Sequence, residues 1–338
     1  MRLLVTGGCG FIGSAFVHMA IARGAEVVNL DKLTYAGNPA NVEDIAGHPG
    51  YSFVHADIAD AEVVREAVEG VDAVVNFAAE SHVDRSILDP GEFIRTDVLG
   101  TAVLLEAARG ADVARFVQVS TDEVYGSILS GAFHETDPIT PSSPYSASKA
   151  GGDLQVLAWH RTYGVDVVVT RGSNTFGPRQ YPEKLIPLFV TNALDGQPLP
   201  VYGDGMQIRD WIYVDDHCEG IWTAMTRGEP GTVYNVGGGY EAPNLEITRR
   251  ILELTGGGPE LIRHVDDRPG HDRRYALDTG RLRALGWQPA RAFEEALDET
   301  VAWYRDRREW WEPIKSGEYR RYYEQQYGER GSQAADPR

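Results

Sequence analysis

Tyr145 and Lys149 are four residues apart, a spacing that places both side chains on one face of a helix. Ser143 and Pro144 just before them are typical of a helix start, with Ser143 as the N-cap and Pro144 in the first turn. A lysine ammonium within a few ångströms favours the phenolate and can lower the pKa of a tyrosine. We therefore expect Tyr145 to act as a base, assisted by Lys149.

Thr121, Asp122 and Glu123 follow a predicted strand. Oxidation of an alcohol by a tyrosine base needs the threonine hydroxyl but not the two carboxyls. A carboxyl pair can supply a general base and a general acid, each worth roughly 10² to 10⁴ in rate, and close packing pushes the two pKa values apart. The alternative is an exposed acidic turn without a catalytic role.

A glycine-rich turn follows the first predicted strand, in two possible registers: Gly7-x-x-Gly10-x-x-Gly13, or the same turn counted from Gly8. Glycines in such a turn let backbone N–H groups approach a pyrophosphate at the next helix N-terminus. Asp31 lies 31 − 13 = 18 residues beyond the last glycine and is placed to accept a hydrogen bond from a ribose 2′-OH. The pattern predicts NAD rather than NADP, the alternative being a solvated aspartate.

The elements that must position these residues alternate in type. Apolar runs predict strands at residues 2–5, 27–30, 51–55, 73–77, 115–119 and 165–170, and amphipathic stretches predict helices at 14–23, 61–69 and 100–109. This alternation predicts an α/β fold with a doubly wound, mostly parallel sheet of the Rossmann type. Asp57 and Ile58 would then lie near an adenine, and the small Ala78 and Ala79 would allow a ligand to pass.

After about residue 176 the pattern loosens into loops with isolated helices at 183–194, 245–255 and 293–308. We predict a NAD-binding domain over 1–175 that carries the catalytic residues, a smaller loop-rich α/β substrate domain over 176–328 whose segments can interleave with the first, and a tail over 329–338. The tryptophans Trp303, Trp310 and Trp311 are interpreted as packing residues.

Composition excludes several classes of function. The chain has 338 residues and a formal charge of −18, which argues against a nucleic-acid or anionic-membrane partner. Cys9 and Cys218 are the only cysteines, so a disulfide scaffold is excluded and a reducing cytoplasm is expected. Neither a membrane helix, nor an N-terminal signal segment, nor a metal-ligand pattern is predicted.

The constellation of glycine turn, Thr121, Tyr145 and Lys149 resembles the extended short-chain dehydrogenase/reductase family. With the acid pair it is similar to the family of dTDP-glucose 4,6-dehydratases, along nearly the whole chain. The segments that carry this resemblance are residues 6–14, 31–38, 78–86, 120–126, 142–150, 182–187 and 268–275.

The resemblance implies a redox-neutral elimination with NAD as the cofactor and dTDP-glucose as the substrate. Tyr145 would take the proton of the 4-OH while hydride leaves C4. Glu123 would abstract the C5 hydrogen and Asp122 would protonate the departing 6-OH. Return of the hydride to C6 would give the 4-keto-6-deoxy sugar. The implied catalytic residues are Thr121, Asp122, Glu123, Tyr145 and Lys149.

The resemblance also implies binding residues. For NAD these are Gly7, Gly10, Phe11, Ile12, Gly13, Asp31, Lys32, Leu33, Thr34, Asp57, Ile58, Phe77, Ala78, Ala79, Ser81, Thr96, Tyr145, Lys149 and Thr175. For the nucleotide sugar they are Ser81, His82, Thr121, Asn174, Lys184, Leu185, Pro200, Val201, Tyr202, Arg209, Asn244, His271, Asp272, Arg273, Arg274 and Tyr275. Tyr202 is a candidate stacking surface for the base. A homodimer through the helices at 100–109 and 150–163 is also implied.

One position departs from the family pattern: Thr175 stands where close relatives commonly have asparagine, which changes a contact toward the cofactor. Two alternatives stay open. One is an epimerase or decarboxylase acting on another nucleotide sugar, against which the acid pair argues. The other is a non-catalytic NAD-sensing protein, which would not need Asp122, Glu123, Tyr145 and Lys149.

Overall fold

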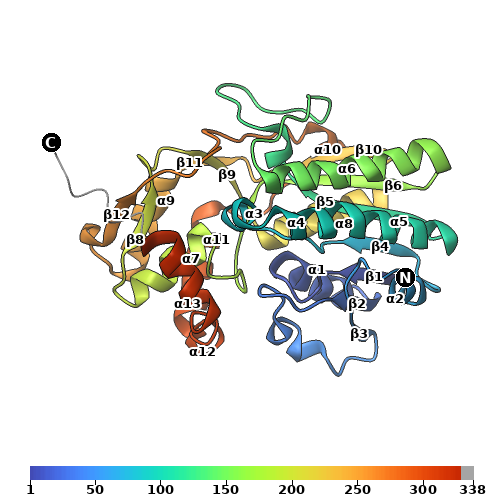
Figure 1. Ribbon diagram of the computed structural model, residues 1–338, viewed down its shortest axis with the longest axis horizontal. Helices are drawn as coiled ribbons and strands as arrows, with labels where there is room; N and C mark the ends of the chain where they lie inside the picture. Colours follow the sequence, from blue (N-terminus) through green and yellow to red (C-terminus); the bar gives the residue numbers. More distant parts are fainter. Residues whose placement is uncertain (329–338) are drawn as a thin grey trace.

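The computed structural model describes residues 1–328 and divides the molecule into two regions, seen on the right and left of Figure 1. The first region is built on a seven-stranded parallel sheet in the order β10-β6-β5-β4-β1-β2-β3. Its strands are β1 (Arg2–Thr6), β2 (Glu26–Asp31), β3 (Tyr51–His55), β4 (Ala73–Asn76), β5 (Arg115–Thr121), β6 (Val167–Gly172) and β10 (Thr232–Val236).

Helices cover both faces of this sheet, because successive side chains of each strand point to opposite faces. Leu3 and Val5 pack with α1 (Phe11–Ala22) and α8 (Val214–Arg227). Leu4, between them, packs on the other face with α2 (Ala61–Ala67), α5 (Thr101–Gly110) and α6 (Pro144–Tyr163). The near-continuous apolar strands of the sequence follow from burial on both faces. The prediction of a doubly wound parallel sheet is confirmed.

The helical run before α5 is longer than the sequence pattern predicted. It begins with α3 (Val83–Leu88) and α4 (Pro90–Phe93) and continues through the π-helical segment η3 (Ile94–Gly100). Thr96 and Asp97 of η3 are buried, and Asp97 Oδ2 accepts a hydrogen bond from the Ser148 hydroxyl of α6 at 2.6 Å. The extra turns therefore place a buried carboxyl against α6.

The second region carries two small sheets. One has the order β11-β9-β7, from β7 (Asn174–Phe176), β9 (Ile208–Tyr213) and β11 (Tyr240–Pro243); the other pairs β8 (Leu199–Tyr202) with β12 (Ile262–Val265). The helices here are α7 (Leu185–Leu194), α9 (Asn244–Thr255), α11 (Phe293–Asp306), α12 (Arg308–Trp311) and α13 (Glu318–Tyr323), while α10 (Gly280–Ala284) packs against β10 and α8 of the first region. Short helical turns are η1 (Pro39–Asn41), η2 (Glu43–Ile45), η4 (Asp122–Tyr125), η5 (Pro259–Leu261) and the π-helical η6 (Glu324–Gly328).

The chain returns to the first region after residue 176. Helix α8 packs on the first sheet, and β10 pairs in parallel with β6 to complete it. The expectation that only isolated helices follow residue 176 is therefore wrong for residues 214–236. The tryptophans of α11 and α12 pack together, with Trp303 and Trp310 rings 5.0 Å apart and Trp311 fully buried, as predicted. The predicted tail over 329–338 lies outside the described residues.

Candidate active site

The acid pair lies in a tight turn at the end of β5. Thr121 is the N-cap of η4, and its Oγ1 accepts a hydrogen bond from the Glu123 backbone N–H at 3.2 Å. The same hydroxyl donates to Asp122 Oδ1 at 3.2 Å. Asp122 is 2% exposed and its Oδ2 has no partner, so the alternative of an exposed acidic turn is wrong.

The two carboxyls stand in different electrostatic surroundings. Burial, and then the neighbouring Glu123 and Asp210, raise the pKa of Asp122 well above its usual range. Burial also raises the pKa of Glu123, but Arg268, Lys184 and Arg209 oppose that rise. Asp122 is therefore suited to hold a proton, and Glu123, surrounded by cations, is suited to act as a carboxylate base.

Tyr145 and Lys149 lie on one face of α6, as predicted. Ser143 and Ser146 form a reciprocal capping box with Pro144 in the first turn, which fixes where this helix begins. Both side chains are buried, and Lys149 Nζ donates to the Val119 carbonyl at 2.9 Å.

The pKa of Tyr145 departs from the sequence-based expectation. Burial, followed by the charges of Glu123 and Asp97, raises it well above the usual value, while a hydrogen bond with Thr121 lowers it. The prediction that Lys149 lowers the pKa of Tyr145 is therefore wrong, because desolvation and the surrounding carboxyls have the larger effect on this pKa. Burial thus favours the neutral phenol of Tyr145 in this structure.

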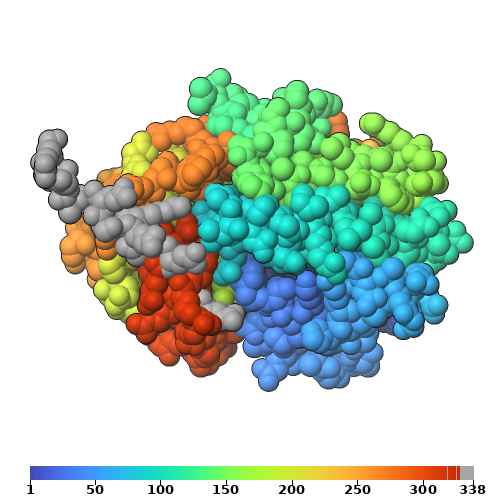
Figure 2. Space-filling model, viewed as in Figure 1, coloured from blue at the N-terminus to red at the C-terminus, as the bar shows by residue number. Residues whose placement is uncertain are grey.

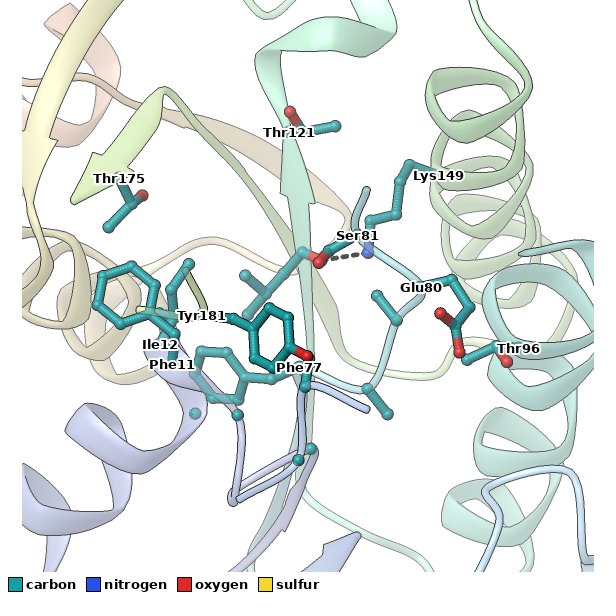
Figure 3. Close-up of a pocket in the computed structure, with 18 of the residues that line it drawn as sticks. Phe11, Ile12, Phe77, Glu80, Ser81, Thr96, Thr121, Lys149, Thr175 and Tyr181 are labelled. Atoms are coloured by element: carbon teal, nitrogen blue, oxygen red, sulfur yellow. Dashed lines mark hydrogen bonds between the residues drawn. The ribbon is translucent and has the colours of Figure 1, made fainter. Parts of the chain in front are cut away.

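A cavity of about 290 Å³ runs along the carboxyl ends of the first sheet, and the predicted catalytic residues Thr121, Asp122, Glu123, Tyr145 and Lys149 are among its lining residues. Figure 3 shows Lys149 reaching into it from α6, with Thr175 on the opposite side. The predicted cofactor residues that line it are Gly7, Gly10, Phe11, Ile12, Gly13, Asp31, Lys32, Thr34, Asp57, Ile58, Phe77, Ala78, Ala79, Ser81, Thr96, Tyr145, Lys149 and Thr175. Leu33 does not line it; its N–H instead donates to Asp31 Oδ1 at 2.8 Å.

The backbone of the glycine turn packs closely on itself because glycines have no Cβ, and this leaves room for a ligand. A Cβ on Gly13 would lie 2.2 Å from the Gly7 carbonyl oxygen, and Gly7 itself has a φ of +69°. Gly10 is the N-cap of α1, so the first N–H groups of that helix face the cavity. Asp31 is 7% exposed, and its other oxygen accepts from the Cys9 N–H at 2.9 Å. These features fit a dinucleotide with its pyrophosphate on the turn.

A second cavity of about 140 Å³ lies beside the first, in the second region. The two cavities share four lining residues, Glu123, Asn174, Glu183 and Lys184, so Glu123 stands at their junction while Asp122 lines the first cavity. The predicted substrate residues that line the second cavity are His82, Asn174, Lys184, Leu185, Pro200, Val201, Tyr202, Arg209, Asn244 and His271, while Ser81 and Thr121 line the first.

Four predicted substrate residues do not line either cavity. Arg273 forms a two-pronged ion pair with Asp204 on the surface, and Arg274 pairs with Glu241. Tyr275 is buried with its ring under the Arg209 guanidinium, and its hydroxyl donates to Asp272 at 2.7 Å. A direct role for these four residues in binding stays a prediction.

Sequence reasoning missed a cation that faces the second cavity. Arg268 lines it, its Nε is buried without a partner, and the nearest charge is Asp84 at 3.9 Å. Arg268 stands in the Arg-Pro-Gly segment that carries the resemblance, but in the sequence nothing distinguishes it from Arg273 as a candidate binding residue. The structure distinguishes the two, because the Arg268 side chain is 15% exposed and that of Arg273 is 49% exposed. Glu80, Glu183, His217 and Tyr327 are further lining residues that were not predicted.

Thr175 meets a partner that the sequence did not indicate. Its hydroxyl hydrogen-bonds the His217 Nδ1 at 2.7 Å and the Ser173 carbonyl at 3.1 Å. Burial lowers the pKa of His217 to about 4, so this imidazole is neutral. The threonine thus joins β7 to α8 at the rim of the first cavity.

Comparison with known proteins agrees with this geometry. Residues 4–300 match the family model described as GDP-mannose 4,6 dehydratase. A dTDP-glucose 4,6-dehydratase of Streptomyces niveus is 55% identical over 94% of this chain and 96% of its own length, and one of Streptomyces antibioticus is 54% identical over 93% and 96%.

Solved structures give the same result. DesIV, a dTDP-glucose 4,6-dehydratase of Streptomyces venezuelae solved with NAD bound, superposes with a TM-score of 0.92 at 53% identity, covering 93% of this chain and all of the other. A UDP-glucose 4-epimerase of Thermus thermophilus, solved with NAD, reaches 0.85 at 35% identity over 91% of this chain and all of the other. The fold is thus shared by dehydratases and epimerases, and the choice between them depends on the site.

Proposed function

The chain belongs to the nucleotide-sugar dehydratase family that the GDP-mannose 4,6 dehydratase model describes, and from this premise we propose that it is an NAD-dependent dTDP-glucose 4,6-dehydratase, a hydro-lyase of deoxysugar nucleotide biosynthesis. One observation carries the choice of reaction: a buried Asp122 beside a cation-flanked Glu123, at the junction of the two cavities.

We propose that the first cavity holds NAD, with the pyrophosphate on the glycine turn, Asp31 on the adenosine ribose and Lys149 on the nicotinamide ribose. When bound, NAD⁺ would supply the hydride acceptor for C4 and, once reduced, the hydride donor for C6, and its positive nicotinamide would favour the Tyr145 phenolate against the burial that raises the pKa of this phenol. Asp31 favours NAD over NADP because a 2′-phosphate would meet a carboxylate.

Tyr145 takes the proton of the sugar 4-OH, assisted by Thr121 and Lys149. The 4-ketone acidifies C5, whose proton passes to Glu123. Asp122, the carboxyl whose pKa is raised well above its usual range, protonates the departing 6-OH and water is lost. Glu123 returns a proton to C5 as the double bond is reduced, which gives the 4-keto-6-deoxy sugar.

The second cavity suits the diphosphate and base of the substrate. A local cluster of cations lines this cavity, although the protein has a net charge of −18: Lys184, Arg209 and Arg268. Burial lowers the pKa of Lys184 and that of Arg209. The binding of a diphosphate would raise both pKa values again, because an anion favours the protonated, charged form of each side chain. With the domain boundary at residue 175, we assign cofactor binding and catalysis to the first domain and binding of the nucleotide sugar to the second.

The experiment that tests this proposal mixes the purified protein with dTDP-glucose and follows product by alkaline absorbance and mass. We expect a 4-keto product lighter by one water, with no net NADH. Interconversion at C4 without loss of water would support an epimerase instead. A non-catalytic NAD-sensing protein would bind NAD and leave dTDP-glucose unchanged.

We also propose a homodimer that works in the cytoplasm. Apolar side chains are about half exposed along α3, η3 and α6, next to the predicted helices 100–109 and 150–163: Leu88, Ile94, Leu99 and Leu154. In Figure 2 these elements form the cyan-to-green band across the visible face. Both cysteines are buried thiols, which agrees with a reducing compartment. Light scattering should give twice the chain mass, and Leu154→Asp should reduce it to one.

None of the helices in residues 1–328 is long and apolar enough to cross a bilayer.

A further inference from the structure

The proposed reaction leaves a proton imbalance that the site must correct after every turnover. Tyr145 gains the proton of the 4-OH, and Asp122 loses a proton to the departing hydroxyl. The C5 proton taken by Glu123 returns to C5, and the hydride taken from C4 returns to C6. Each cycle therefore ends with Tyr145 protonated and Asp122 ionised, the reverse of the state that starts the next cycle.

Both groups are shielded from bulk water. Tyr145 is 9% exposed and Asp122 2%. Asp122 Oδ2 has no partner, and among residues 1–328 the hydrogen bond that the structure gives its carboxyl is the one from the Thr121 hydroxyl.

Thr121 is in contact with both groups. Its Oγ1 donates to Asp122 Oδ1 at 3.2 Å, its side chain lines the first cavity together with that of Tyr145, and its hydroxyl lowers the pKa of Tyr145 by hydrogen bonding. The Glu123 N–H donates to the same oxygen at 3.2 Å, which holds the side chain in this orientation. A hydroxyl is both donor and acceptor, so this arrangement can accept one proton while giving up another.

Resting on the proposed function, we infer that Thr121 is a proton relay that restores the site directly, from Tyr145 to Asp122. The Tyr145 O–H bond breaks as its proton passes to Thr121 Oγ1. At the same time the Thr121 O–H bond breaks as its proton passes to Asp122 Oδ1. The products are the Tyr145 phenolate and the Asp122 carboxylic acid; no electron is transferred and Thr121 is unchanged.

The relay gives Thr121 a second role, distinct from orienting the sugar 4-OH. An orienting hydroxyl contributes equally to the first and to later turnovers. A relay contributes only after the first, because the resting enzyme has had time to equilibrate its protons with solvent. The two roles are therefore separated by comparing single and multiple turnovers of one variant.

The test uses the NAD-loaded protein with Thr121→Val, which removes the hydroxyl but keeps the β-branched shape, and Thr121→Ser as the matched control. Rapid quench measures product with enzyme in excess and with dTDP-glucose in excess. We expect Thr121→Val to form one product per site and then continue about tenfold or more slowly, the scale of a lost positioned proton transfer. Imidazolium buffer should restore its later turnovers, and Thr121→Ser should show no such break.

An equal slowing of first and later turnovers, unaffected by buffer, would overturn the relay and leave Thr121 an orienting residue. A break that imidazolium does not relieve would also overturn it, since slow product release has that signature. If Thr121→Val does not fold, Thr121→Ala lacks the same hydroxyl and carries the same test. Failure of the wild type to make any 4-keto product would instead reject the proposed function, and the relay with it.

Discussion

The two cavities are built in different ways although they meet at one acid pair. The first lies at the carboxyl ends of parallel strands, and the closely packed Gly7 and Gly13 and the small Ala78 are among its lining residues. The second takes cationic side chains from segments far apart in the sequence, such as Lys184, Arg209 and Arg268. Substitutions at the glycine turn and at these cations should therefore damage the two cavities separately.

The largest effect is expected at the acid pair, where a substitution should affect elimination and oxidation at C4 differently. Asp122→Asn keeps the shape of the acid but cannot protonate the 6-OH, so elimination should fall by roughly 10² to 10⁴. Oxidation at C4 uses Tyr145 and the first cavity, and it should survive. Stopped-flow absorbance at the reduced nicotinamide band should show NADH accumulating on mixing with dTDP-glucose. Full turnover in this variant would show that the acid is misassigned.

Damage confined to the first cavity is expected from Gly13→Ala. The new Cβ would lie 2.2 Å from the Gly7 carbonyl oxygen, and backbone cannot move aside cheaply. Overpacking of this kind costs about 1–3 kcal/mol, so NAD should bind roughly tenfold to a hundredfold more weakly in calorimetry.

Gly47→Ala is the matched control for Gly13→Ala, since nothing lies within 4 Å of a Cβ at Gly47 and its φ is not positive. It should bind NAD as the wild type does. Equal binding by both variants would contradict the placement of NAD on the glycine turn.

Damage confined to the second cavity is expected from Arg268→Met. Its Nε is buried and its side chain, 15% exposed, lines the cavity. A hydrogen bond to a charged group is worth about 1.5–3 kcal/mol, so KM for dTDP-glucose should rise by about tenfold or more with NAD affinity unchanged. Arg273→Met removes an exposed arginine that pairs with Asp204 and should change KM less than about twofold. A larger effect at Arg273 than at Arg268 would reverse our assignment of the phosphate-binding cations.

The smallest effect is expected at Thr175. Thr175→Asn restores the residue common in relatives and replaces the hydroxyl that bonds His217. One neutral hydrogen bond is worth about 0.5–1.5 kcal/mol, so the Kd for NAD should shift by less than about tenfold. The product should be unchanged; a different product would mean that this position selects the reaction.

The same contrast explains what the sequence could and could not predict. Glycine spacing, strand periodicity and the Ser143-Pro144 start are local, and each lies where it was expected. Strand β10 was missed because its pairing with β6 joins residues more than sixty apart in the chain. Arg268 and Arg273 look alike in sequence, and only the fold buries one and pairs the other on the surface.

The pKa of Tyr145 was mispredicted for a related reason. A four-residue spacing identified Lys149, but burial and the charges of Glu123 and Asp97 outweigh it. Val83 and Phe93 pack on Tyr145 from α3 and α4, and Asp97 lies in the π-helical segment η3, a helical run that the periodicity did not indicate. The difference in pKa between Asp122 and Glu123 was expected from their adjacency. The cations that favour Glu123 as the base, Arg268, Lys184 and Arg209, come from segments distant in the sequence.

The central claim is that the acid pair turns a C4 oxidation into an elimination with return of the hydride to C6. Turnover of dTDP-glucose deuterated at C4, followed by mass and NMR analysis of the sugar, tests it most directly. We predict loss of one water and deuterium in the C6 methyl group. Deuterium that remains at C4 of an epimerised sugar with its water retained would contradict the account.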